Sequence, residues 1–143
     1  MTDAVRISPA DALAKMSEGY TYVDVRSVPE FTEGHPEGAV NVPYLHQGPG
    51  GMTPNPEFLE VMKLRFPKDA KIILGCRSGG RSLRALGELV AEGFTNVVDQ
   101  RAGWDGARDA FGQITEPGWS RANLPSTAGN PKGTSYEELR TGA

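Results

Sequence analysis

The chain has 143 residues and a formal net charge of −3, which fits a single domain built around one hydrophobic core. Its 15 basic and 18 acidic residues nearly balance, so the molecule offers no overall electrostatic attraction for nucleic acid or an anionic membrane. No stretch reaches the roughly 18 apolar residues that a membrane-spanning helix needs. The N-terminus lacks the basic start and apolar run of a secretory signal, and the single cysteine cannot form an internal disulfide, so we expect a cytoplasmic protein.

The first half of the chain predicts one helix and two short strands. Residues 8–19 begin with a serine cap followed by proline and end at glycine, which is typical of a short helix. β-Branched and aromatic residues at 20–25 predict a strand, and residues 38–43, closed by a proline, predict a second one. Between these strands, proline and glycine leave room for no more than a helical turn. Residues 43–55 are also rich in proline and glycine and predict a loop that could flank a site.

The second half predicts a parallel β-α-β unit. Residues 55–67 repeat the cap-plus-proline start and predict another helix. Residues 70–75, AKIILG, form a nearly continuous apolar run, which is typical of a strand buried on both faces in a parallel sheet. After a glycine-containing loop, the sequence predicts a helix over 83–93 and a strand over 95–100. We therefore predict an α/β fold, a three-layer domain whose central, mostly parallel sheet has helices on both faces.

The C-terminal part of the chain carries weaker signals. We expect a helical turn around residues 104–111 and irregular structure beyond Pro117, where Gly, Pro, Ser, Thr and Asn are abundant. Apolar residues within 136–139 predict a short terminal helix that pins this end to the body. We divide the chain into a domain over residues 1–112 and an irregular C-terminal tail over 113–143 that can dock on it.

Cys76 lies where the predicted buried strand turns into a helix, in the sequence CRSGGRS. The amides that follow point their N–H groups into the loop, and the positive end of the helix dipole adds to them, so this turn favours an anion. Gly79 and Gly80 let the backbone curl tightly, while Arg77 and Arg81 place two positive charges within one turn of the sulfur. We therefore interpret Cys76 as a reactive thiolate rather than an inert buried thiol.

The CRSGGRS loop after a buried strand resembles the active-site loop of rhodanese-type sulfurtransferases. Residues 23–43, VDVRSVPEFTEGHPEGAVNVP, resemble the signature of the same family, in which Asp-Val-Arg is followed by Glu-Phe, Gly-His, Gly-Ala and Asn-Val-Pro. AGWDGA around Trp104 resembles the Gly-Trp segment that these domains carry after the last core strand. The resemblance covers residues 7–111 in three separate motifs. It departs from the family at Pro36, where Ile or Val is more common, and it does not extend past Gly112.

The resemblance implies a chemistry for this loop. It makes Cys76 the nucleophile that carries sulfur as a persulfide, and it implies that six residues bind substrate: Arg77, Ser78, Gly79, Gly80, Arg81 and Ser82. The implied reaction is ping-pong, with thiolate attack on the outer sulfur of a donor such as thiosulfate, release of sulfite, and transfer to cyanide or a thiol acceptor. A small-molecule sulfur donor and an acceptor are the implied partners, and no metal or organic cofactor is required.

Two other functions are open at this stage. A sulfur-relay protein would receive its persulfide from a protein donor and pass it to a biosynthetic acceptor. A phosphatase or arsenate reductase of the same fold needs five residues between the cysteine and an arginine that grips the phosphate. Ser82 occupies that position, and Arg81 comes one residue too early. The shorter loop therefore favours a sulfur atom over a phosphate.

Other polar residues near these motifs have simpler interpretations. Asp24, Arg26 and Glu30 suggest acid–base catalysis, but in the resembling family this stretch ties the first strand to its neighbouring loop by hydrogen bonds and an ion pair. His35 and His46 have no further cysteine or histidine ligands nearby, so they predict no metal site. His46 lies in the loop near the expected site, and the sequence leaves open whether it contacts substrate.

Overall fold

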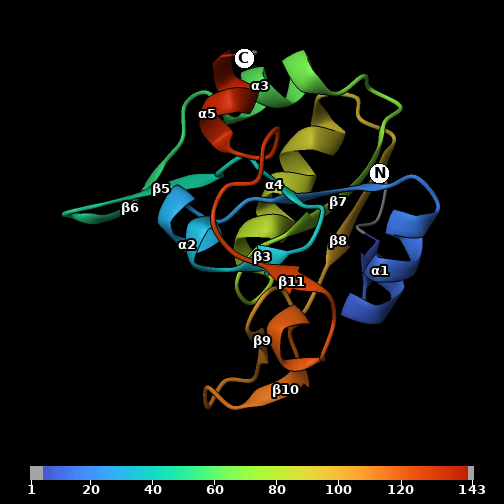
Figure 1. Ribbon diagram of the computed structural model, residues 1–143, viewed down its shortest axis with the longest axis vertical. Helices are drawn as coiled ribbons and strands as arrows, with labels where there is room; N and C mark the ends of the chain where they lie inside the picture. Colours follow the sequence, from blue (N-terminus) through green and yellow to red (C-terminus); the bar gives the residue numbers. More distant parts are fainter. Residues whose placement is uncertain (1–4, 142–143) are drawn as a thin grey trace.

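The computed structural model describes residues 5–141 and is built around a five-stranded sheet (Figure 1). The strands lie in the order β1-β8-β7-β2-β4, and every neighbouring pair is parallel. The apolar run of residues 70–75 forms the central strand, as its buried pattern predicted. The predicted α/β class is therefore confirmed. The strands of this sheet are β1 (Arg6–Ile7), β2 (Thr21–Asp24), β4 (Val40–Asn41), β7 (Lys71–Gly75) and β8 (Asn96–Gln100).

Helices cover both faces of the sheet. On one face, Ala12 of α1 packs in a cluster that includes Ile73 of the central strand. On the other face, Leu86 of α4 and residues of α3 pack in a cluster with Ile72 and Leu74, because successive side chains of a strand point to opposite faces. None of the described helices is long and apolar enough to cross a membrane. The helices are α1 (Pro9–Ser17), α2 (Val28–Glu33), α3 (Phe58–Arg65), α4 (Gly80–Ala91) and α5 (Tyr136–Thr141).

The point at which a helix begins determines which backbone amides lie in the loop after Cys76. α1 begins at Pro9, where the Ser8 hydroxyl accepts a hydrogen bond from the Asp11 N–H at 3.1 Å, as the cap signal predicted. α4 begins at Gly80, earlier than its apolar spacing indicates. The first turn of α4 therefore follows Cys76 after only three residues, and the unpaired amides of that turn lie in the loop.

The segments between the first strands are more regular than the sequence predicted. In place of a single helical turn, α2 spans six residues and is capped at its start, where Glu30 accepts hydrogen bonds from the N–H and hydroxyl of Ser27 at 3.1 and 2.9 Å. In place of a loop, residues 45–54 form an antiparallel hairpin that projects from the body beside α2 (Figure 1). Apart from Pro54 at its end, the proline and glycine of the hairpin lie at its turn, in residues 48–51. The hairpin strands are β5 (Leu45–Gly48) and β6 (Gly51–Pro54).

The helical turn expected around residues 104–111 is wrong. This segment contains β9 (Gly106–Arg108), which pairs antiparallel with β10 (Ile114–Pro117). Gly106 has a φ of 146°, and its N–H donates to the Arg77 carbonyl oxygen at 3.4 Å. A left-handed backbone and a long-range hydrogen bond at this position are incompatible with a right-handed helical turn.

Residues beyond 112 pack on both faces of the sheet. Trp119, in the short 3-10 helix η1 (Trp119–Arg121), is fully buried with its ring 5.5 Å from that of Tyr22. β11 (Ser126–Thr127) pairs with β3 (His35–Pro36). The predicted short terminal helix is confirmed as α5, whose Tyr136 joins the core cluster beneath α3 and α4.

Candidate active site

The sulfur of Cys76 lies inside a ring of hydrogen-bond donors at the end of β7. The residue is 2% exposed. The Gly79 N–H donates to Cys76 Sγ at 3.1 Å, and the Ser82 N–H donates to it at 3.4 Å. The Ser82 hydroxyl is also 3.4 Å from the sulfur. Fixed donors around one atom stabilise negative charge on that atom, so the site suits a thiolate nucleophile.

The path of the loop depends on the absence of a side chain at Gly79. Its φ is 101°, in the left-handed region that favours glycine. A Cβ at this position would lie 2.5 Å from the Arg101 carbonyl oxygen. Any other residue would move the backbone and with it the N–H that contacts Cys76.

A turn after β8 holds the start of the loop from the opposite side. The Trp104 N–H donates to the Cys76 carbonyl oxygen at 2.7 Å, and the Asp105 N–H donates to the Arg77 carbonyl oxygen at 2.9 Å. A Cβ on Gly103 would lie 2.5 Å from the same Cys76 oxygen. The structure therefore brings the AGWDGA motif, far away in sequence, against the CRSGGRS loop.

Three further amides of the loop are available to a ligand. Among residues 5–141, no group accepts a hydrogen bond from the backbone N–H of Ser78, Gly80 or Arg81. Ser78 and Gly80 are exposed, whereas Gly79 and Ser82 are buried beside the sulfur. The loop thus combines inner donors that contact Cys76 with outer donors that remain free.

Arg81 is tied to α2 and is not a free cation of the loop. Its Nη1 and Nη2 lie 2.7 and 3.1 Å from the two carboxylate oxygens of Glu30. Burial would raise the pKa of Glu30, but the hydrogen bonds and charge of Arg81, together with Ser27, hold it at about 2. Arg77 is different, because it is 65% exposed and its nearest carboxylate oxygen, on Asp105, is 4.0 Å away. The two free cations expected from the sequence are reduced to one.

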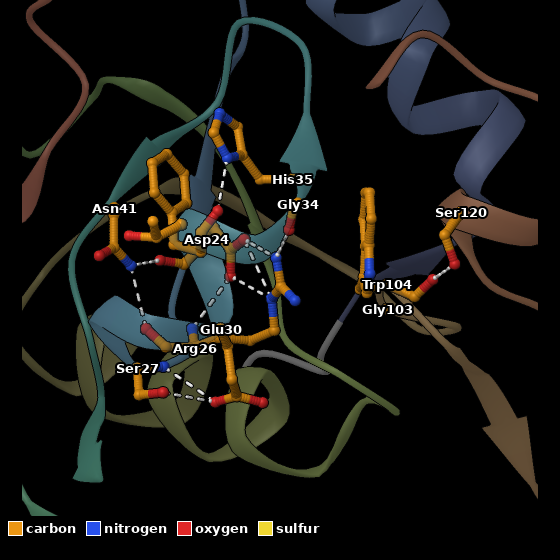
Figure 2. Close-up of polar contacts among 12 residues, drawn as sticks. Asp24, Arg26, Ser27, Glu30, Gly34, His35, Asn41, Gly103, Trp104 and Ser120 are labelled. Atoms are coloured by element: carbon orange, nitrogen blue, oxygen red, sulfur yellow. Dashed lines mark hydrogen bonds and ion pairs between the residues drawn. The ribbon is translucent and has the colours of Figure 1, made fainter. Parts of the chain in front are cut away.

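A buried polar network surrounds the end of β2 (Figure 2). Arg26 Nη2 lies 2.7 Å from Asp24 Oδ2 and also donates to the Gly34 carbonyl oxygen. The side-chain amide of Asn41 donates to the backbone oxygens of Asp24 and Arg26, both at 3.0 Å. Asp24 and Arg26 therefore tie β2 to its neighbouring segment, as predicted for this stretch. Glu30 differs, because its partner is Arg81 in the loop.

Arg6 and Asp99, which no sequence motif singled out, brace the loop through Gly79. Arg6, in β1, donates from Nε to Asp99 Oδ2 at 2.7 Å and from Nη2 to the Gly79 carbonyl oxygen at 3.2 Å. Burial raises the pKa of Asp99, although Ser82 and Arg6 favour its charged form. Asp99 Oδ1 has no hydrogen-bond partner among the described residues. Both contacts join residues that are far apart in the sequence, so no local motif indicates them.

A polar cleft of about 410 Å³ opens beside the loop. It lies between α2, the loop and the turn after β8, and Arg77 belongs to both the cleft and the loop. His46 lies instead in β5, with its ring 5.9 Å from that of Tyr136 in α5. Whether His46 contacts substrate stays an open prediction. The cleft is lined by Arg26, Glu30, Glu33, Arg77, Trp104 and Asp105.

Comparison with known proteins agrees with this fold and loop. Residues 8–110 match the Rhodanese-like domain family, so the chain belongs to that family. It is 41% identical over 110 residues to thiosulfate sulfurtransferase 16, chloroplastic, of Arabidopsis thaliana, a match covering 77% of this chain and 82% of the relative. It is 48% identical over 86 residues to the senescence-associated protein DIN1 of Raphanus sativus, which covers 60% of this chain and about half of that longer relative, 47%.

A solved structure shows the same architecture over nearly the whole chain. The crystal structure of Rv0390 from M. tuberculosis superposes with a TM-score of 0.74 and 30% sequence identity, covering 90% of this chain and 100% of that one. The predicted rhodanese-type resemblance and fold are therefore confirmed.

Replacing Gly79 tests the geometry of the loop. We expect Gly79→Ala to lower the rate of Cys76 alkylation by iodoacetamide at least tenfold, because the displaced backbone no longer directs its N–H at the sulfur. Strain at this position should also lower the free energy of unfolding by about 1–3 kcal/mol. Gly87→Ala, where the new methyl meets nothing within 4 Å, is the matched control. Equal alkylation rates in the two variants would contradict this role of Gly79.

The Glu30–Arg81 ion pair predicts a pH dependence of stability. The pKa of Glu30 falls from an ordinary 4.5 to about 2 on folding, so its contribution is complete above pH 4.5 and is lost as the pH drops towards 2. Between pH 6 and pH 3 the wild type should lose about 2 kcal/mol more unfolding free energy than Glu30→Gln. Urea unfolding at both pH values measures this difference. Parallel losses in the two proteins would show that the pair is not coupled to folding.

Proposed function

We propose that this protein is a sulfurtransferase that moves a sulfane sulfur atom from thiosulfate to cyanide or a thiol through a persulfide on Cys76. The observation that carries the proposal is the set of N–H donors of the loop, two in contact with Cys76 Sγ and others that have no acceptor among the described residues. Membership of the rhodanese-like family and a relative named thiosulfate sulfurtransferase support it.

The first half-reaction loads the cysteine. The Cys76 thiolate attacks the outer sulfur of thiosulfate, a new S–S bond forms, and the S–S bond of thiosulfate breaks with its electron pair on departing sulfite. The negative charge then resides on the outer sulfur of the persulfide. We assign the free amides of Ser78, Gly80 and Arg81 to that outer sulfur, because they are donors of the same loop without an acceptor.

The second half-reaction returns the enzyme to its starting state. Cyanide or a thiolate attacks the outer sulfur, the persulfide bond breaks, and its electron pair remains on Cys76 Sγ. The same inner donors, from Gly79 and Ser82, stabilise the thiolate as attacking group in one half-reaction and as leaving group in the other. Arg77 supplies positive charge at the mouth of the loop.

Transfer from a protein persulfide donor is a second candidate function, and the pairing of Arg81 favours it. Two unpaired cations would favour binding of a free dianion such as thiosulfate. Glu30 neutralises Arg81, so Arg77 is the arginine of the loop that remains to attract such a dianion. The same pairing argues against a phosphatase or arsenate reductase, which needs an arginine free to grip the oxyanion.

Intact-mass measurement tests the proposed persulfide. After exposure to thiosulfate and removal of the excess, the protein should gain about 32 Da, the mass of one sulfur, and cyanide should remove it. Cys76→Ser should gain nothing. The same mass gain on Cys76→Ser would place the sulfur elsewhere and refute the mechanism. Slow turnover of thiosulfate and cyanide together with rapid loading by a cysteine desulfurase would select the relay function instead.

A further inference from the structure

The cleft beside the loop carries two charges of opposite sign, one unpaired and one held only by a long contact to a shared carboxylate. Glu30 is paired with Arg81, and the two oxygens of Asp105 are 2.7 and 2.8 Å from Arg108 and Arg121. Glu33 is exposed and forms no ion pair among residues 5–141. Arg77 lies 4.0 Å from an Asp105 oxygen that Arg108 already holds at 2.7 Å. One unpaired anion and one cation whose carboxylate partner is shared with two other arginines therefore line the same cleft.

The cationic part of the cleft is reinforced by a rigid donor. Arg26 is 3% exposed, and its Nε and Nη2 are fixed by Asp24 and Gly34. No described residue accepts a hydrogen bond from its remaining nitrogen, Nη1, which Figure 2 shows free of contacts on the side of Trp104. The Arg26 guanidinium is 5.1 Å from the centre of the Trp104 ring. The fixed N–H donor of Arg26 and the ring of Trp104 thus lie in the same cleft as the exposed charge of Arg77.

We propose that this cleft binds the acceptor, and that the acceptor is a small thiol carrying both an ammonium and a carboxylate group, as an amino-acid thiol does. The carboxylate contacts Arg77 and Arg26 Nη1, and the ammonium contacts Glu33. This inference rests on the proposed persulfide of Cys76. It adds the chemical class of the acceptor and assigns a binding role to Glu33, Arg26 and Trp104.

Charge and volume distinguish this ligand from the others considered. A dianion such as thiosulfate would be repelled by the unpaired carboxylate of Glu33. A zwitterion can place its ammonium group beside Glu33 and its carboxylate beside Arg77. A volume of about 410 Å³ far exceeds the needs of cyanide and suits a small organic molecule. The cleft is also adjacent to the nucleophile, because Arg77 follows Cys76 and the Trp104 N–H bonds the Cys76 carbonyl.

The transfer step balances without a further reactant. The acceptor thiol passes its proton to the negatively charged outer sulfur of the Cys76 persulfide and attacks that sulfur as the thiolate, forming the S–S bond of the product persulfide. The bond between the two sulfurs on Cys76 breaks, and its electron pair remains on Sγ as the thiolate. The proton stays on the transferred sulfur, so one thiolate is consumed and one is regenerated.

Single-turnover transfer to three thiols tests the cleft. Protein loaded with thiosulfate and freed of excess donor is mixed with cysteine, with cysteamine, which has only the ammonium, or with 3-mercaptopropionate, which has only the carboxylate. Loss of the persulfide is followed by intact mass. Because each variant is compared across the same thiols, differences in their intrinsic acidity cancel.

Glu33→Gln should slow transfer to cysteine and cysteamine about two- to fivefold relative to 3-mercaptopropionate, the range of one exposed ion pair. Arg77→Gln should slow transfer to cysteine and 3-mercaptopropionate relative to cysteamine. Glu37→Gln, which removes an exposed carboxylate of the same segment outside the cleft, should leave all three ratios unchanged. Unchanged ratios in Glu33→Gln, with normal loading of Cys76, would overturn the assignment of the cleft and leave the proposed function intact.

A binding measurement tests the cleft independently of the persulfide. It remains informative if thiosulfate does not load the protein and the proposed function is wrong. S-methylcysteine has both charged groups but cannot react. On the unloaded protein it should shift the indole N–H signal of Trp104 in NMR spectra, with weaker binding to Glu33→Gln than to Glu37→Gln. Equal binding to both variants, or a shift confined to the buried Trp119, would overturn the cleft on its own.

Discussion

The site depends on the left-handed backbone at Gly79, which turns two amide groups of the loop towards one sulfur atom. The Gly79 N–H reaches Cys76 Sγ at 3.1 Å only because no side chain separates this residue from the Arg101 carbonyl. The donor from Ser82 follows from the early start of α4 at Gly80. Dipoles that are fixed before the reaction need no reorganisation when charge develops on the sulfur. In the proposed mechanism, this short strand-to-helix turn therefore provides most of the chemistry.

The ion pairs around the loop fix its conformation more than they add net charge to it. Arg81–Glu30 joins the loop to α2, Arg6–Asp99 joins β1 to β8, and Arg26–Asp24 lies within the segment at the end of β2. Each pair neutralises one cation and one anion. What remains is a site dominated by backbone amides, with the exposed charges of Arg77 and Glu33 at its entrance. In the proposed mechanism, the inner loop activates the nucleophile and the outer cleft selects the acceptor. The three pairs are Arg26–Asp24, Arg81–Glu30 and Arg6–Asp99.

Local signals in the sequence were sufficient for the central architecture and for the position of Cys76 at the end of a buried strand. The apolar run before Cys76 and the amphipathic helix after it define a β-α-β unit whose buried strand ends at the cysteine. The ion pair of Asp24 and Arg26 was anticipated through the family resemblance. Each of these features lies within a short stretch of chain or within a recognisable motif.

Features that depend on distant partners could not be predicted in this way. Arg81 and Glu30 are 51 residues apart, and only the folded chain brings α4 and α2 close enough for them to pair. The segment around Gly106 is strand and turn because it bonds to the loop carbonyl of Arg77, an interaction that its own composition does not reveal. The hairpin of residues 45–54 was hidden for another reason, since the proline and glycine of its turn suggested an irregular segment throughout.

The most direct test of the account is a crystal structure of the thiosulfate-treated protein. The account predicts a second sulfur bonded to Cys76 Sγ and directed into the loop, within hydrogen-bonding distance of the amides of Ser78, Gly80 and Arg81. The Gly79 and Ser82 contacts to Sγ should remain in place. A second sulfur that points away from these amides would contradict the claim that the loop backbone holds the transferred atom.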